Sequence, residues 1–479
     1  MVQSEISSIE HALTHHIRVF LFQHFSKEGL RRTCFATSLG VCLFAGSVMT
    51  FSLFTDPLIY DLQYSQLQIN IIGGSIAAGL YFFLPMLGYL ADLHGPVLLA
   101  ALSMLTFGPS YFLAAIVYKY KLSYLLMCLA FMLIGAATAS LYFCSLLTCA
   151  KIYPQSKGLS ISGPVTAFGV SAMLITQITK LSYFSKEGSS MTDPFKCFIG
   201  FTILYCVLSL LNWIASVMVT VEKEVVFDTP EQNYGSTADS EPFSSPEEEA
   251  NHRRTFDAFL KEPSTYMLLF AFLFLAGPME MYVTNMGNLL KVVGTSGASS
   301  PISKQVSAFS LSSTTARLFV GGLSDFLENN SRLKGKYAIM GLLLVTCIPG
   351  LVGFSMIATN QPHFGTITTL VGCTYGAVFS LFPTIVASRW GVENLGSTWG
   401  TFMVAPATGS VLAGTFYALQ YSRSCVGSAD NTSWNYCLTL PFGIMAFGFA
   451  LAIVLIFISW GQFTRQNDKY EALSQHEQS

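Results

Sequence analysis

The strongest constraint on this chain is a series of apolar stretches, each about 20 residues long and carrying few or no charges. An α-helix of that length crosses the hydrocarbon core of a bilayer, because each residue adds about 1.5 Å. Only 11% of the residues are charged, against about 25% in soluble proteins. The sequence therefore predicts an all-α integral membrane protein with twelve transmembrane helices. They begin near Cys34, Ile69, Val97, Tyr124, Leu159, Phe195, Thr265, Ile302, Tyr337, Gly365, Thr398 and Leu440.

A polar segment, residues 222–264, divides the twelve stretches into two groups of six. It is acidic, rich in Ser and Pro and poor in apolar residues, so we expect a largely disordered cytosolic linker. A short amphipathic helix over His252–Lys261 stays open. The expected organisation is a cytosolic tail, a first six-helix bundle, the linker, a second six-helix bundle and a second cytosolic tail, with bounds 1–33, 34–221, 222–264, 265–461 and 462–479.

The distribution of basic residues predicts the orientation. Placing both termini in the cytosol gives the cytosolic segments most of the 25 Lys and Arg residues, as the positive-inside rule requires. The loop before the last stretch then lies on the opposite side. It contains the sequon at Asn431, flanked by Cys425 and Cys437. We expect a glycan on Asn431 and leave a Cys425–Cys437 disulfide open.

The two halves share a motif in which a glycine precedes an aspartate by four residues. GYLADLHGP contains Gly88 and Asp92, and GGLSDFLEN contains Gly321 and Asp325. Each motif closes the second apolar stretch of its half. Matches that keep one register across two halves indicate a parallel internal repeat, as in transporters built from two bundles.

A second match supports the same register. Lys151 precedes Gly158 by seven residues after the fourth stretch of the first half, and Arg389 precedes Gly396 by seven in the second. The offsets of the two matches agree within a few residues, so one internal repeat accounts for both pairs.

The position of the two aspartates suggests their role. An acid at the end of one helix accepts hydrogen bonds from the free N–H groups that start a neighbouring helix, where the helix dipole favours negative charge. A glycine one turn earlier lets that helix approach closely. We therefore interpret Gly88 with Asp92, and Gly321 with Asp325, as polar latches that break and reform with conformation. The alternative is a pair of ordinary interfacial charges.

The first motif resembles the loop-two motif of the major facilitator superfamily. Gly88, Leu90, Ala91, Asp92 and Gly95 match it, whereas the basic residues that usually follow are absent. The second copy lacks the later glycine. The resemblance implies the major facilitator fold, with twelve helices in two six-helix bundles, and adds Gly95 to the first latch.

A closer resemblance covers most of the chain. The segments LQYSQLQIN, GYLADLHGP, LYFCSLLTCAKIYP, GPMEMYVTNMGNL and SSTTARLFVGGLSDF are similar to the fungal monocarboxylate-permease-homologue group of that superfamily. The resemblance implies a multi-pass protein of the vacuolar membrane and gives no substrate. True monocarboxylate permeases have an aspartate four residues before the arginine of their eighth span. Arg317 matches the arginine, but Ser313 stands in place of the acid.

Two charged residues lie inside predicted spans, where charge is costly and marks a functional site by default. Arg317 has a planar guanidinium that matches a carboxylate in a two-pronged contact, so it is our candidate for binding an anionic substrate. A structural ion pair is the alternative. Glu280 is its candidate partner and a candidate proton-binding group, since burial and a nearby arginine act on it in opposite directions.

These features predict a secondary transporter that moves a small anionic or polar solute across the vacuolar membrane by alternating access. The alternative is a membrane receptor of the same fold that transports nothing. The sequence has no recognisable nucleophile or metal set, so we do not expect an enzyme, a cofactor or a metal ion. Expected partners are the small-molecule substrate, protons as the coupling ion, and membrane lipid, with no nucleic acid.

Overall fold

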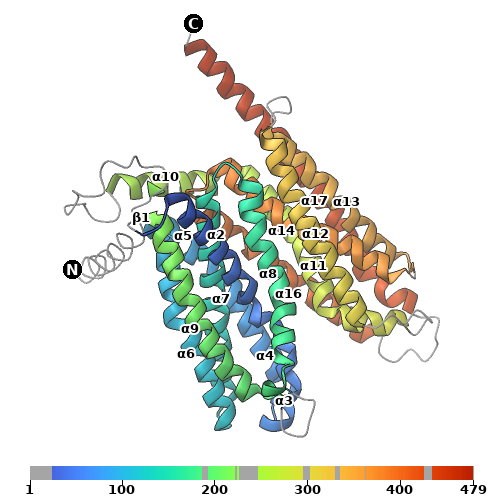
Figure 1. Ribbon diagram of the computed structural model, residues 1–479. Coiled ribbons are helices and arrows are strands. Elements are labelled where there is room, and N and C mark those ends of the chain that lie inside the picture. The colour runs from blue at the N-terminus through green and yellow to red at the C-terminus, as the bar shows by residue number, and fades with distance from the viewer. Residues whose placement is uncertain are drawn as a thin grey trace. The chain divides into compact units, whose positions relative to one another are not determined.

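The structure is a computed structural model that describes residues 24–185, 192–221, 224–225, 246–294, 302–329, 335–361, 363–424 and 434–477. Apart from a two-residue antiparallel pair, β1 (Thr220–Val221) with β2 (Glu224–Val225), its regular elements are helices (Figure 1). The prediction of an all-α protein is confirmed.

Each of the twelve apolar stretches coincides with a helix or with helices that follow one another directly. They are α2 (Lys27–Phe44) with η1 (Ala45–Thr50); α4 (Gln66–Ala77), η2 (Ala78–Phe82) and α5 (Leu84–His94); α6 (Val97–Lys119); α7 (Tyr124–Ile152); α8 (Lys157–Thr179); α9 (Pro194–Val219); α11 (Pro263–Gly294); α12 (Ile302–Asn329); α13 (Gly335–Ala358); α14 (Phe364–Trp390); α15 (Leu395–Phe402) with α16 (Val404–Ser424); and α17 (Trp434–Glu477).

Within the described residues, 11 of these spans are long and apolar enough to cross a membrane. The exception is α12, which has 28 residues but is rich in Ser and Thr and contains Lys304, Arg317, Asp325 and Glu328. Its length suits a membrane span, and its faces differ: Arg317 is buried, whereas Phe319 and Phe326 are exposed. The span that carries Arg317 is thus the one of the twelve that is not apolar enough by composition alone.

Local sequence explains where several helices start and stop. Ser65 accepts a hydrogen bond from the Gln68 amide, and the Gln68 side chain bonds back to the Ser65 amide, which forms a capping box at the start of α4. Ser123 caps α7 in the simpler way. At the end of α5, Gly95 has a φ of 79°, a backbone conformation that glycine adopts readily. The chain can therefore turn directly after the first latch motif.

Two α-helices, α3 and α10, lie outside the predicted spans. α3 (Ser52–Leu62) occupies part of the first expected loop, and α10 (Pro246–Lys261) lies in the linker. A single short turn, η3 (Ser182–Phe184), also lies between spans. The helix left open over His252–Lys261 is present and begins six residues earlier, whereas most of the remaining linker lies outside the described residues, so its expected disorder stays a prediction. Apolar residues at helical spacing give α10 a face that packs.

The chain divides into two compact units. Unit 1 contains residues 1–156, 163–257 and 390–401, so it includes nearly all of α15 from the second half of the sequence. In unit 1, α6 packs along α9 and α7 (Figure 1). Its core is aromatic and hydrogen-bonded: the Tyr111 and Tyr205 rings stack, and the Tyr205 hydroxyl donates to the Phe44 carbonyl at 2.6 Å.

Unit 2 contains residues 157–162, 258–389 and 402–479, so it includes the first turn of α8 from the first half of the sequence. α11 packs against α16 and α17, and α13 packs against α17. Phe272 contacts Phe382 in its core with ring centroids 4.5 Å apart, and Phe354 contacts Phe449 at 4.9 Å.

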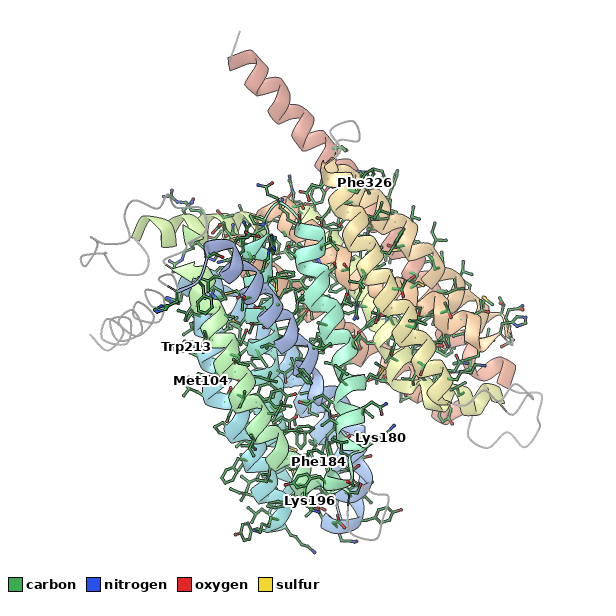
Figure 2. The ribbon with its side chains drawn as sticks, viewed as in Figure 1. Met104, Lys180, Phe184, Lys196, Trp213 and Phe326 are labelled. Atoms are coloured by element: carbon green, nitrogen blue, oxygen red, sulfur yellow. The ribbon has the colours of Figure 1, made fainter. Side chains whose placement is uncertain are left out.

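Large apolar side chains cover the outside of the helices, as a lipid-facing surface requires. Phe326 projects outward with 64% of its surface exposed (Figure 2).

In unit 1, Lys180, Phe184 and Lys196 gather where α8 leads to α9 (Figure 2).

The expected glycan and disulfide sites are largely outside the described residues. Asn431 and Cys425 lie there entirely. Cys437 lies at the start of α17, although its side chain is not described.

Candidate functional site

The first latch is formed inside unit 1 by Asp92, near the end of α5, and the first turn of α15. The carboxylate accepts hydrogen bonds from the Gly396 amide at 3.0 Å, and from the Ser397 amide and hydroxyl at 2.6 Å each. Asp92 is only 5% exposed. Free amides and the positive end of the helix dipole compensate for its buried charge.

Close backbone contact makes these hydrogen bonds possible. A β-carbon on Gly88 would collide with the backbone carbonyl of Gly396, and one on Gly396 would lie 2.5 Å from a carboxylate oxygen of Asp92. Both positions therefore require glycine. Gly95 ends α5 with its positive φ three residues after Asp92, and so belongs to the turn that follows the latch.

The second latch has the same plan and lies inside unit 2. Asp325, near the end of α12, accepts hydrogen bonds from the Gly158 amide at 2.6 Å and the Leu159 amide at 2.9 Å. These are the second and third residues of α8, as Gly396 and Ser397 are of α15. A β-carbon on Gly321 would collide with the Ser162 side chain.

The aspartates of the first repeat match contact the glycines of the second, and each aspartate binds the glycine that comes from the other half of the sequence. Asp92 binds the amide of Gly396, and Asp325 binds that of Gly158. The sequence identified all four residues but did not pair them. The shared register of the two repeat matches could have indicated this pairing, because an acid and a glycine that both recur in two halves can each contact the copy in the other half.

An ion pair accompanies the second latch. Lys157 donates to Glu328 at 3.1 Å, with side-chain exposures of 21% and 16%. The cations of the second repeat match differ in their contacts. Arg389 pairs with Glu262 at 3.0 Å, whereas Lys151 is 6% exposed and interacts electrostatically with Asp92.

The charged residues of the spans meet around an aromatic residue of α14 inside unit 2. The Tyr375 hydroxyl donates to Glu280 of α11 at 2.9 Å. The Arg317 guanidinium lies over the Tyr375 ring, 5.5 Å from its centroid, within the range of a cation–π interaction. Arg317 is 6% exposed and interacts electrostatically with Glu280. The structure thus brings together Arg317 and Glu280, the two residues predicted from their charge.

A contact between small residues positions this cluster. A β-carbon on Gly376 would collide with the backbone of Ser313, so α12 and α14 touch directly one turn before Arg317. On the next turn of α14, the Ser380 hydroxyl donates to the Arg317 carbonyl at 3.4 Å. This contact sets Tyr375 beside the guanidinium. Sequence reasoning did not select Tyr375, because helical periodicity does not show which neighbour faces a given charge.

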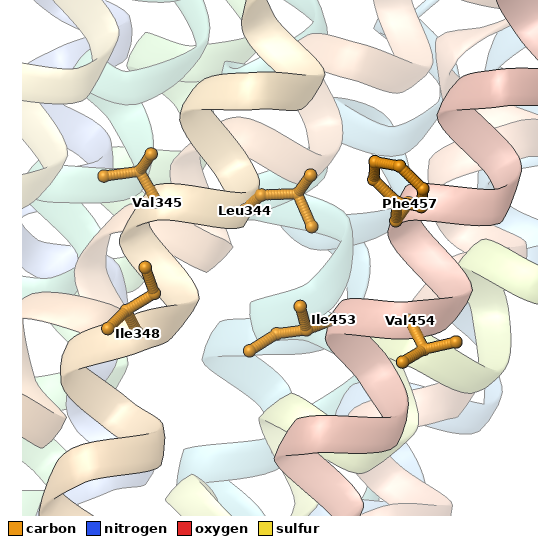
Figure 3. A pocket seen from close by; sticks show the side chains of 6 residues that line it. All are labelled: Leu344, Val345, Ile348, Ile453, Val454 and Phe457. Atoms are coloured by element: carbon orange, nitrogen blue, oxygen red, sulfur yellow. The ribbon is translucent and has the colours of Figure 1, made fainter.

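A separate hollow lies on the outside of unit 2 between α13 and α17. It measures about 290 Å³ and is lined by Leu344, Val345, Ile348, Ile453, Val454 and Phe457 (Figure 3). Each of these side chains is apolar, so the hollow offers no group to orient a polar solute. The Arg317–Tyr375–Glu280 cluster has charged and hydroxyl groups that can orient one, and we take it as the candidate binding site.

Long apolar helices that pack in two compact units are typical of a polytopic membrane protein. The chain matches the Major Facilitator Superfamily over residues 37–414 and belongs to it. It is a multi-pass membrane protein of the secondary-transporter class and not an enzyme. Members of this superfamily carry small solutes and often couple their movement to protons.

Fungal proteins described as probable transporter MCH1 are similar along nearly their whole length. The protein of Wickerhamomyces anomalus is 43% identical over 444 residues, which cover 91% of this chain and 89% of that protein. The Saccharomyces cerevisiae protein is 31% identical over 474 residues, with coverages of 94% and 96%. The predicted membership of this fungal group is confirmed.

Solved structures share the fold. A fucose:proton symporter of E. coli, FucP, matches with a TM-score of 0.56 at 11% identity, covering 89% of this chain and 98% of the symporter. The human organic anion transporter MFSD10 matches with a TM-score of 0.53 at 16% identity, covering 89% and 96%. The predicted major facilitator fold is confirmed.

Proposed function

We propose that this protein transports a small anionic solute across the vacuolar membrane by alternating access, and that Arg317 binds the solute's negative group. The observation that carries the proposal is the position of Arg317, 6% exposed within α12 and beside Tyr375. A charge in the middle of a span costs about 2.5–3.5 kcal/mol on the insertion scale. A bound anion offsets that cost, and a guanidinium fork gives it a defined orientation.

Glu280 is the candidate coupling group. It accepts a hydrogen bond from Tyr375 and lies near enough to Arg317 to interact with it. When a solute carboxylate takes the guanidinium, the negative charge near Arg317 rises and favours a proton on Glu280. Solute and proton binding would therefore be linked, which suits exchange or co-transport driven by a proton gradient.

The two latches are the proposed conformational elements. Each joins an acid in one half of the sequence to a helix start in the other half. When either latch breaks, water can form hydrogen bonds with the carboxylate and the amides. The free-energy difference between the closed and the open latch is therefore moderate. Alternating access requires such bistable contacts.

The vacuolar location rests on resemblance to the fungal group. With both termini cytosolic, Asn431 would lie in the lumen and carry a glycan. Glycosidase treatment of wild-type protein and of Asn431→Gln tests this orientation: the wild type alone should shift in mass. A reporter at Ser479 that faces the vacuolar lumen would overturn it.

The experiment for the transport proposal is counterflow in proteoliposomes with pairs of solutes that differ only in charge. Each pair consists of a small carboxylate and its neutral amide. We expect counterflow of the carboxylate in each transported pair and no counterflow of the matching amide. Arg317→Lys should retain weak transport, because it keeps a cation without the planar fork. Amides transported as well as their acids would overturn the proposal.

The alternative of a fixed Arg317–Glu280 ion pair is tested by stability. If that pair is structural, Arg317→Gln and Glu280→Gln should each lower the unfolding temperature, and the double variant should recover most of the loss. Our proposal expects Arg317→Gln to lose transport in a folded protein. It also expects the double variant to stay inactive.

A further inference from the structure

The helix in the linker, α10, packs against the first latch inside unit 1. The His252 ring lies 5.3 Å from the ring of Tyr89, and the Phe256 ring lies 5.7 Å from it. Tyr89 follows Gly88 directly in α5. His252 is 9% exposed, whereas its neighbours Arg253 and Arg254 are exposed. This face of α10 is therefore docked on the helix that carries Asp92.

A hydrogen-bond chain continues this contact to the latch. The Nε2 atom of His252 lies 3.2 Å from the Ser397 hydroxyl oxygen, which lies 2.6 Å from the Asp92 carboxylate. A carboxylate only accepts hydrogen bonds, and a hydroxyl has one hydrogen to donate. Ser397 therefore gives its hydrogen to Asp92, and His252 must donate its own Nε2–H to Ser397.

We propose that His252 is a positioning residue of the first latch, through which the linker helix α10 controls how firmly that latch closes. The inference rests on the latch role given above and extends it to the linker. With its oxygen held by His252, the Ser397 hydroxyl keeps its hydrogen directed at Asp92. Release of α10 removes that constraint, and Asp92 then loses its best-directed side-chain donor.

Among the described residues, the second latch shows no matching third component. Its donors to Asp325 are the amides of Gly158 and Leu159, and the Leu159 side chain has no hydroxyl where Ser397 has one. Its neighbouring ion pair, Lys157 with Glu328, comes from the two latch helices themselves. Among the described residues, the hydrogen bond from α10 is made to the first latch.

The test is amide hydrogen exchange of the full chain in detergent, read in peptides that cover the starts of α15 and α8. His252→Phe keeps an aromatic ring for Tyr89 but removes the donor. His252→Gln restores a donor at similar reach without the ring. Arg253→Gln, at an exposed site on the same helix, is the matched control.

We expect His252→Phe to speed exchange at the start of α15 by about fivefold, the value of one ordinary hydrogen bond. Exchange at the start of α8 should not change. His252→Gln and Arg253→Gln should stay within about twofold of wild type. An unchanged His252→Phe protein, or a His252→Gln protein as fast as it, would overturn the role of the donor.

Asp92→Asn separates this inference from the latch itself. If Asp92→Asn speeds exchange at α15 and His252→Phe does not, the latch stands and the linker's role is rejected. If neither variant has an effect, the latch role fails and the inference fails with it.

Discussion

Each of the two compact units contains a latch of the same plan, but the units differ in the residue that lies one helical turn before the latch glycine. In unit 2, Arg317 precedes Gly321 by four residues, and in unit 1 the corresponding residue is Leu84. Both side chains are buried, at 6% and 1% exposure. The repeated part of the design is thus the conformational contact, whereas the charge belongs to one unit. Our proposal therefore assigns motion to both units and solute binding to the second.

The latches also differ in their surroundings. Asp92 has three donors, one of them a hydroxyl held by His252. Asp325 has two backbone donors and a neighbouring ion pair. A buried network of directed hydrogen bonds is less sensitive to salt than a partly exposed ion pair. We therefore expect the surroundings of the first latch to depend less on ionic strength than those of the second.

The largest effect should come from giving unit 1 the charge of unit 2. Leu84→Arg places a guanidinium at a fully buried, apolar position, and we expect it to lower the free energy of unfolding by about 3 kcal/mol. Thermal unfolding in detergent measures this loss, with Leu84→Met as the control for size. An Arg variant that melts with the wild type would show that unit 1 accommodates a guanidinium at the position equivalent to Arg317.

A smaller difference should separate the two latch glycines. In Gly88→Ala the new methyl group meets the backbone of Gly396, which has no side chain to move, whereas in Gly321→Ala it first meets the Ser162 side chain. Overpacking of this kind costs about 1–3 kcal/mol, and we place Gly88→Ala at the upper end. Equal losses of unfolding free energy in the two variants would contradict the contrast.

The aspartates should differ least. Asp92→Asn and Asp325→Asn keep size but remove the charge facing a helix start, an interaction of about 0.3–1 kcal/mol. With three donors against two, Asp92→Asn should speed exchange of the α15 amides more than Asp325→Asn speeds that of the α8 amides. The balance of states, followed through engineered cysteines, should shift in both. A larger effect at Asp325 would reverse our ranking.

Sequence reasoning was sufficient for the twelve membrane-spanning helices, because apolar length depends on bilayer thickness and not on packing. It also located the glycines and acids at which helices touch, through their repetition. It did not identify their partners, since the crossed contacts of Asp92 with Gly396 and of Asp325 with Gly158 depend on tertiary structure.

The linker helix α10 and the position of Tyr375 had no local sequence pattern that could predict them. The composition of the linker indicated disorder, yet α10 is stabilised by packing of His252 and Phe256 on Tyr89, which propensity does not include. Tyr375 is one of many aromatic residues in apolar helices. Its selection depends on the contact of Gly376 with Ser313.

The most direct test of the central claim is solute binding by an Arg317→Gln protein that is shown to be folded. The measurement is counterflow of the best carboxylate from the acid and amide pairs, beside the unfolding temperature of the same preparation. We predict that binding weakens by about 2–5 kcal/mol, as expected when the charged partner of a buried anion is truncated, while the unfolding temperature stays near wild type. Counterflow that persists at the wild-type level would show that Arg317 does not bind the solute.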